Sequence, residues 1–387
     1  MKFEFATAGR IVFGAGSSAD AARLTAEIGQ RAFVVTGGQP ERFRSVLDPL
    51  RRSALASAFF RVTAEPTLAT VLAATREART AQCDVVVGVG GGSVLDTAKA
   101  VAALLTNSED IFDYLEVIGR ARPLTNLAAP CVAIPTTSGT GSEVTRNAVL
   151  GSPEHRVKVS LRHPSMLPRL AIVDPDLTLE LPPAATASSG CDALVQLIEP
   201  FVSSRANPIT DGLCREGLDR AARSLRRVYE RGDDRSARTD MSIASLLGGL
   251  ALSNAGLGSI HALANPIGGR FGAPHGAVCG VLLPSMMAAN LRAAEADLFG
   301  GSVGPLYERY GEVAHILTAG ASRDPEAGIA WARQLISDVK LPRLRTYGIT
   351  EHDLPPLAAD ALKTNSMKAN PVKLTAEQCA EGARGAL

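Results

Sequence analysis

Three short apolar runs limit the fold of the first half of this chain more than any other feature, at residues 32–35, 85–89 and 131–134. Each run ends at a cluster of glycine, proline or threonine, as buried parallel strands commonly do. Between the first two runs, residues 67–78 have the pattern of a helix, so strand, crossover helix and strand alternate. Residues 171–175 resemble one last strand. The first half is therefore predicted to be an α/β domain with a parallel, Rossmann-like sheet.

The second half has a different pattern, which begins after Pro182 and Pro183. Long amphipathic segments replace the short apolar runs, and strand signals almost vanish. Helices are expected at residues 193–202, 209–231, 236–252, 261–269 and 277–292, with others between 306 and 341 and near the C-terminus. We place the boundary near residue 178. The prediction is a dinucleotide-binding α/β domain over residues 1–178 and an all-helical metal- and substrate-binding domain over residues 179–387.

The composition favours a small-molecule enzyme. The net charge of +1 over 387 residues gives no field that would hold nucleic acid or an anionic membrane surface. No apolar run reaches the roughly 18 residues that a membrane-spanning helix needs. The six cysteines are scattered, without a CxxC pair or a signal peptide ahead of them, which predicts the reducing cytoplasm. We expect no nucleic acid or membrane partner, and self-association as a homo-oligomer, a dimer.

A glycine-rich turn follows the second apolar run, where residues 85–99 read as a strand, three consecutive glycines and a helix start. Glycines let a pyrophosphate approach the backbone, and the N-terminus of the following helix favours an anion. The segment does not match the strict G-x-G-x-x-G fingerprint, and glycines also make ordinary tight turns. A phosphate-binding junction is the functional interpretation.

A second polar cluster, at residues 135–143, follows the third apolar run and supplies several hydroxyl groups and two glycines. A ligand-facing loop is predicted here, with a serine- and threonine-rich surface loop as the alternative. The two loops would then face one ligand.

These two loops also carry a resemblance. GGGSVLDTAK at residues 90–99 and PTTSGTGSEVT at residues 135–145 are similar to the cofactor motifs of the iron-containing alcohol dehydrogenase family, and the similarity covers essentially the whole chain. It implies a dehydroquinate synthase-like fold, with an α/β half followed by a helical half. The positions expected to touch the dinucleotide are Gly91, Gly92, Ser93, Asp96, Thr136, Thr137, Thr140 and Lys158. Lys158 has a second interpretation as a plain surface charge.

The choice between NADP and NAD depends on the end of the first apolar run. Enzymes of such folds that prefer NAD place an acidic residue there to hold the ribose 2′-hydroxyl, and this chain has Gly37. A missing carboxylate allows a 2′-phosphate, with which Arg42 and Arg44 could pair. Alternatively, Gly37 only serves the turn and either cofactor binds.

The second half continues the resemblance with Asp192-Ala193-Leu194, Glu199, His261 and Pro274-His275-Gly276. Asp192 and Gln196 lie four apart, on one face of a helix. The resemblance implies that Asp192, Gln196, His261 and His275 hold a divalent metal, Fe²⁺ or Zn²⁺. The family has a histidine where this chain has Gln196, whose amide oxygen is a weaker donor. A lone histidine is more often structural than a ligand.

Asn265 is a second departure from the family, because many members have a histidine there that is suspected of helping proton transfer. Asn265 cannot titrate, so the proton would leave through water, a ribose hydroxyl or another side chain. We count Asp192, His261, His275 and Asn265 as the candidate catalytic residues.

The resulting prediction is a reversible, metal-assisted hydride transfer between a nicotinamide and a small alcohol or its aldehyde or ketone. Three alternatives remain open at this point. One is a metal-independent enzyme that resembles maleylacetate reductases, and another is a metal lyase that resembles dehydroquinate synthase. The third is a dinucleotide-binding protein without turnover, which the changes at Gln196 and Asn265 suggest.

Overall fold

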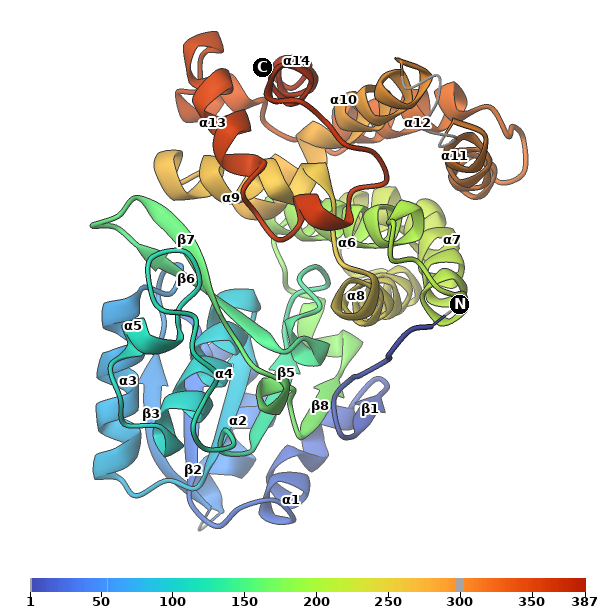
Figure 1. Cartoon of the computed structure of the whole chain (residues 1–387). Helices are drawn as coiled ribbons and strands as arrows, with labels where there is room; N and C mark the ends of the chain where they lie inside the picture. The colour runs from blue at the N-terminus through green and yellow to red at the C-terminus, as the bar shows by residue number, and fades with distance from the viewer. Residues whose placement is uncertain (1, 54, 297–302) are drawn as a thin grey trace. The chain divides into compact units, whose positions relative to one another are not determined.

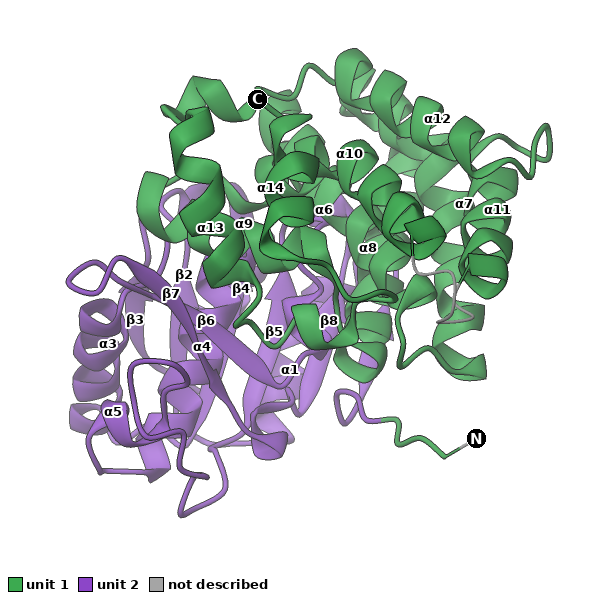
Figure 2. Cartoon of the chain, turned by 45° about the horizontal axis from the view of Figure 1, so that its top comes forward, with its two compact units in different colours: residues 1–5, 181–387 green, residues 6–180 purple. Residues whose placement is uncertain are grey.

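The computed structural model describes residues 2–53, 55–296 and 303–387. The chain forms two compact units (Figure 2). Ala6–Glu180 make up one, which we call the sheet unit, and Leu181–Leu387 with Met1–Phe5 make up the other, which we call the helical unit. The predicted boundary at residue 178 lies close to this division, but the grouping of the first five residues with the second half was not anticipated.

The sheet unit is built on six parallel strands in the order β1-β8-β5-β4-β2-β3. This confirms the predicted parallel α/β half. The strands are β1 (Ile11–Phe13), β2 (Ala32–Thr36), β3 (Ala56–Arg61), β4 (Val85–Gly90), β5 (Cys131–Pro135) and β8 (Leu170–Val173). All carboxyl ends lie on one edge because the strands are parallel, and ligands of open α/β sheets bind at that edge.

Helices cover both faces of this sheet, which explains why its central strands are apolar throughout (Figure 1). Phe33 and Val35 of β2 belong to the core under α3 and α4, whereas Val34, between them, belongs to the core under α1 and α2. The helices of this unit are α1 (Ala21–Ala26), α2 (Arg44–Arg52), α3 (Leu68–Thr80), α4 (Gly92–Thr106) and α5 (Ile111–Tyr114).

Four strands escaped the sequence analysis. The edge strands β1 and β3 are short or partly exposed, so neither forms a buried apolar run. The other two, β6 (Asn147–Ser152) and β7 (Val157–Arg162), form an antiparallel hairpin. In β6, buried and partly buried residues alternate, which is the pattern of a strand with one solvated face. A search for continuous apolar runs does not detect that alternation.

The helical unit contains no strand among its described residues, which confirms the predicted all-α half (Figure 2). Its helices are α6 (Pro183–Val202), α7 (Pro208–Glu230), α8 (Arg235–Ala255), α9 (Ser259–Phe271), α10 (His275–Ala296), α11 (Val303–Leu317), α12 (Pro325–Asp338), α13 (Leu354–Ala361) and α14 (Ala376–Arg384). Helix α6 begins well before the predicted residue 193, and Gly190 stands inside it. A β-carbon at Gly190 would lie 2.3 Å from the Leu225 side chain, so this glycine allows close packing and does not end the helix.

Helix α10 is long and apolar, and it packs inside this unit. By length and composition it is the one single helix of the described residues that could cross a membrane, and α8 with α9 would also pass as a pair bent by 101°. However, 83% of the apolar window of α10 is buried inside the protein. Its hydropathy is therefore that of a core helix, packed against α6, α9, α12 and α14.

Candidate active site

The two predicted cofactor loops are in direct contact within the sheet unit. Helix α4 starts at Gly92, immediately after β4, and the first N–H groups of a helix have no partner inside it. A β-carbon at Gly92 would lie 2.7 Å from the Thr140 side chain, and one at Gly91 would lie 3.2 Å from Thr137. The glycines are needed because the second loop packs on the start of α4, and a pyrophosphate at this junction would meet both loops.

Asp96 of α4 joins the loops to the hairpin. Its carboxylate accepts hydrogen bonds from the Ser142 hydroxyl (2.6 Å) and from the backbone N–H of Val149 (2.9 Å). Lys99, fully buried, lies 3.2 Å from the same carboxylate and donates to the Thr145 hydroxyl. Both oxygens of Asp96 are thus bound to protein groups. Its predicted contact with the dinucleotide stays a prediction, and its structural role was missed.

The remaining predicted cofactor residues lie around the same edge. Thr136 is buried directly after β5, and Ser93 stands in the first turn of α4. Lys158 of β7 lies 2.6 Å from Glu65, so its ammonium group already has a carboxylate partner. Gly37 follows β2 and has room for a side chain, because a β-carbon there would approach only Val94, at 3.8 Å. Dinucleotide contact by these residues stays a prediction.

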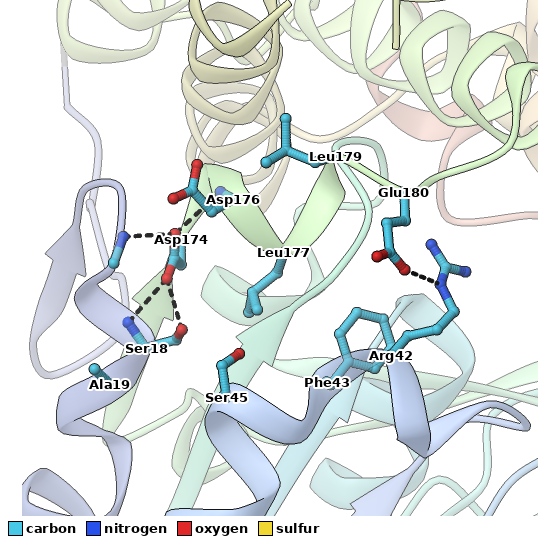
Figure 3. A pocket seen from close by; sticks show the side chains of 11 residues that line it. Ser18, Ala19, Arg42, Phe43, Ser45, Asp174, Asp176, Leu177, Leu179 and Glu180 are labelled. Atoms are coloured by element: carbon cyan, nitrogen blue, oxygen red, sulfur yellow. Dashed lines mark hydrogen bonds and ion pairs between the residues drawn. The ribbon is translucent and has the colours of Figure 1, made fainter. Parts of the chain in front are cut away.

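The two arginines proposed for a 2′-phosphate differ. Arg44 is exposed at the first residue of α2. Arg42 lines a pocket beside Asp174 and Glu180, and Figure 3 shows its guanidinium group pointing toward Glu180. Arg42 donates a hydrogen bond to this carboxylate over 3.2 Å. Glu180, which was not among the predicted residues, competes for Arg42 with any phosphate.

The helical unit brings three predicted metal ligands together from three helices. Asp192 lies on α6, His261 on α9 and His275 at the start of α10. The Asp192 carboxylate oxygen lies 3.3 Å from Nε2 of His261 and 3.9 Å from Nε2 of His275. The sulfur of Cys279 joins them, and the ligand atoms of all four residues lie within 4.8 Å of one another.

Several polar side-chain atoms in and beside this cluster are buried without a hydrogen-bond partner among the described residues. They are Oδ1 of Asp192, Oε1 of Gln196 and Nε2 of His261. Leaving a buried polar group unsatisfied costs roughly 1–3 kcal/mol, so the atoms of Asp192 and His261, which lie 3.3 Å apart, need an explanation. A divalent cation that accepts their lone pairs supplies one, and carboxylate and imidazole groups are suitable ligands for Fe²⁺ or Zn²⁺. The residues therefore fit a metal.

Glu199 fixes the orientation of His261. Its carboxylate lies 2.7 Å from Nδ1 of the ring and also accepts the backbone N–H of Ile260 at the start of α9. A ring that donates from Nδ1 to a carboxylate presents the lone pair of Nε2 on its other side, where Asp192 lies. Glu199 belongs to the residues that carry the resemblance, but no role was predicted for it.

Burial and mutual charge act on these groups in opposite directions. Burial by itself raises the pKa of Asp192, but the close approach of His261, with the charges of His275 and His261, leaves that pKa below its ordinary value. Burial lowers the pKa of His261, but Cys279, Asp192 and Glu199 raise it well above the usual range. Together these groups favour positive charge at the centre of the site.

Gln196 and Asn265, the two positions where this chain departs from the family, occupy different environments. Gln196 is buried one turn after Asp192, and its amide oxygen is one of the unpartnered atoms. Asn265 lies one turn after His261 on α9 and is partly exposed. Cys279 was not predicted, although it follows His275 by four residues, the same spacing that drew attention to Asp192 and Gln196.

Comparison with known families agrees with this geometry over both units. Residues 8–175 match the family model described as iron-containing alcohol dehydrogenase. Residues 186–385 match the model described as Fe-containing alcohol dehydrogenase family, C-terminal.

Individual relatives are similar along most of their length. Alcohol dehydrogenase 4 of Saccharomyces cerevisiae is 39% identical over 315 residues, which cover 81% of this chain and 78% of that protein. The alcohol dehydrogenase from Oenococcus oeni superimposes with a TM-score of 0.90 at 31% identity and covers both chains fully. A sulfoacetaldehyde reductase from Bifidobacterium kashiwanohense, solved in complex with NAD⁺, superimposes with a TM-score of 0.85 at 26% identity and covers 100% of this chain and 99% of its own.

Proposed function

The chain belongs to the iron-containing alcohol dehydrogenase family, and on that premise we propose that it interconverts a small alcohol and its aldehyde or ketone. It is an NAD(P)-dependent alcohol dehydrogenase. The hydride passes between the substrate carbon and C4 of the nicotinamide. The comparisons do not favour the maleylacetate reductase-like or dehydroquinate synthase-like alternatives.

One observation carries the metal part of this proposal. Asp192, His261 and His275 converge from three helices, and the facing atoms of the first two are buried without a partner in the described part of the chain. A satisfied structural cluster would not leave these atoms open. Bound Fe²⁺ or Zn²⁺ supplies Lewis-acid chemistry toward the substrate oxygen.

The protein's own groups then have separate roles. Glu199 holds the His261 ring in one orientation, and the short spacing of Asp192 and the two imidazoles fixes the centre. His275 has a side chain that is 30% exposed, so it marks the side of the cluster that a small substrate can approach. In the sheet unit, the N-terminus of α4 and the adjoining Thr137 and Thr140 bind and orient the dinucleotide.

The proton requires a separate route. Oxidation of an alcohol releases a proton, and Asn265, one turn beyond His261, has no group that could take it. Its amide can only orient a neighbour by hydrogen bonding. We assign the proton to water or to a ribose hydroxyl of the cofactor.

The finer assignments are also proposals. NADP use is supported by Gly37 and opposed by the pairing of Arg42 with Glu180, so NAD and NADP both remain candidates. All six cysteines are free and buried, which supports a reducing compartment such as the cytoplasm. Assembly as a homodimer stays a prediction from size alone.

The test is elemental analysis of the purified protein, together with NADH and NADPH oxidation against a panel of small aldehydes, repeated after chelation. We expect about one bound iron or zinc per chain, aldehyde-dependent turnover, and loss of turnover on chelation that is reversed when the metal is restored. Turnover by a metal-free protein that is indifferent to chelation would contradict the metal assignment. Cofactor binding without any turnover would contradict the assignment of the protein as an alcohol dehydrogenase.

A further inference from the structure

We propose that the thiolate of Cys279 is a direct ligand of the metal, in preference to the amide oxygen of Gln196. The inference rests on the metal site proposed above and names its fourth donor. Cys279 is fully buried on α10, one turn after His275, so two donors from a single helical turn face the same point.

The spacing of the donor atoms supports four-coordination. A tetrahedral site with bonds of about 2.0–2.3 Å separates its ligand atoms by about 3.3–3.8 Å. The cluster shows 3.3 Å between Asp192 and His261, and 3.9 Å between Asp192 and His275. The sulfur of Cys279 lies 3.6 Å from Nε2 of His275, which continues the series. All four ligand atoms lie within 4.8 Å of one another, so one ion can reach each of them.

Gln196 is the competing donor, and the chemistry favours sulfur. A neutral amide oxygen is a weak ligand for Zn²⁺ or Fe²⁺, whereas a thiolate is among the strongest that proteins offer to zinc. Gln196 lies one turn after Asp192 on the same face of α6, beside that carboxylate. We assign Gln196 to positioning Asp192.

Coordination is balanced without any redox step. The thiol proton of Cys279 is released to solvent as the sulfur–metal bond forms, as is general for cysteine ligands. The resulting set of two imidazoles, one carboxylate and one thiolate shifts the preference of the site toward zinc, because sulfur ligands suit that ion.

The experiment replaces the native metal with Co²⁺ in the full-length protein and records the absorption spectrum. A thiolate ligand gives an intense near-ultraviolet sulfur-to-cobalt charge-transfer band, and four-coordination gives strong visible d–d bands. We expect both in the unmodified protein. Bound Co²⁺ without the charge-transfer band would overturn the role of Cys279 and leave the metal site standing. Absence of Co²⁺ binding would overturn the metal site itself.

Three variants locate the sulfur. Cys279→Ser, which preserves volume, should abolish the charge-transfer band and weaken Co²⁺ affinity at least about tenfold. Cys191→Ser is the matched control, since Cys191 is equally buried and directly precedes Asp192, yet does not belong to the cluster. It should keep the band, and loss of the band in this variant instead would overturn the assignment.

The double variant Gln196→His with Cys279→Ser guards against a folding defect. A new imidazole one turn after Asp192 should restore Co²⁺ affinity to the serine variant, while the charge-transfer band stays absent. Affinity that returns together with the band would show that the sulfur comes from elsewhere and would overturn the proposal. Affinity that does not return in a folded double variant would show that Cys279→Ser weakens binding by disturbing the site and not by removing a ligand, which would overturn the proposal.

Discussion

The polar groups beside α4 in the sheet unit differ from those of the metal cluster in the helical unit in how their hydrogen bonds are satisfied. In the sheet unit, both oxygens of Asp96 are hydrogen-bonded, Lys99 has Thr145 and Asp96, and Lys158 has Glu65. In the helical unit, Asp192 and His261 are more deeply buried than Asp96, at 2% and 4% exposure against 16% for the Asp96 side chain, but present atoms without a hydrogen-bond partner in the described structure. The bonded groups beside α4 hold the shape of the loops, whereas the unpartnered atoms of Asp192 and His261 leave room for a ligand.

This difference reflects what each ligand demands. A dinucleotide is bound over many atoms, largely by backbone N–H groups and hydroxyls, so the loops that carry those groups need an internal frame. A metal ion takes a few lone pairs directly, so its ligands must not be bonded elsewhere. Within the metal cluster, the His261 ring is held on the side away from Asp192, where Glu199 binds its Nδ1.

The largest expected effect comes from removing a predicted metal ligand whose oxygen has no hydrogen-bond partner in the described structure. Asp192→Asn keeps the shape but removes the anionic donor, so bound metal should fall below a tenth per chain. Turnover should fall at least about 100-fold, because loss of a group that only supports a ligand already costs 10- to 100-fold. Elemental analysis and aldehyde reduction measure both. Asp219→Asn on α7, exposed and paired with Arg223, is the matched control and should change neither. Full metal content in Asp192→Asn would break the comparison.

Removing Asp96, whose carboxylate holds the second loop and the hairpin, should instead lower the free energy of unfolding. Asp96→Ala deprives Ser142, Val149 and Lys99 of their partner, and breaking a buried ion pair typically costs roughly 3–5 kcal/mol. Urea titration should show this loss in the free energy of unfolding. Metal content should be unchanged. Asp48→Ala breaks an exposed pair with Arg51 and should cost under about 0.5 kcal/mol. Metal loss in Asp96→Ala without loss of stability would reverse the assignment.

The third prediction concerns Glu143, buried in the second loop. Burial raises its pKa to about 7, although its backbone hydrogen bond and Lys99 act against this rise. A raised carboxyl pKa means that stability is highest at low pH and falls as pH rises from about 4.5 to 7. A tenfold change in proton affinity is worth about 1.4 kcal/mol, so Glu143→Gln should gain roughly 2–3 kcal/mol over the parent between pH 5 and pH 8.

Urea titrations of parent and variant at the two pH values measure this difference. Glu154→Gln, in the exposed turn of the hairpin, makes the same chemical change and should show no such gain. An equal difference at pH 5 and pH 8 for Glu143→Gln would mean that Glu143 is already ionised in the folded protein at pH 5.

The sequence predicted most of the architecture because its signals are local. The run 85–89 followed by three glycines indicated β4 and the start of α4 directly. The hairpin of β6 and β7 was missed because its signal is alternation, which one solvated face produces. For the same reason the contact between Asp96 and the hairpin could not be predicted.

The candidate site was predicted unevenly. The resemblance named Asp192, His261 and His275, and the structure brings their side chains together. Metal binding by these residues stays a prediction. Cys279 lies within the apolar residues of α10, where a thiol reads as core packing. Only the geometry of the folded helix shows that its sulfur faces His275.

The smallest expected effect concerns Arg42, which the sequence suggested as a partner of the 2′-phosphate of NADP. In the structure, Arg42 donates a hydrogen bond to Glu180 instead. If Arg42 faces the 2′-phosphate of NADP, Glu180→Gln removes both a competing partner and a repulsive charge. The ratio of kcat/KM for NADPH over NADH should then rise by about three- to tenfold, which is the scale of one partly exposed ion pair. Glu41→Gln removes the same charge nearby, from a pair with Arg61, and should leave the ratio unchanged. An unchanged ratio in Glu180→Gln would show that Arg42 does not contact the 2′-phosphate. Arg42 would then have a structural role, as Asp96 does, because loss of its carboxylate partner would not alter the preference between the two cofactors.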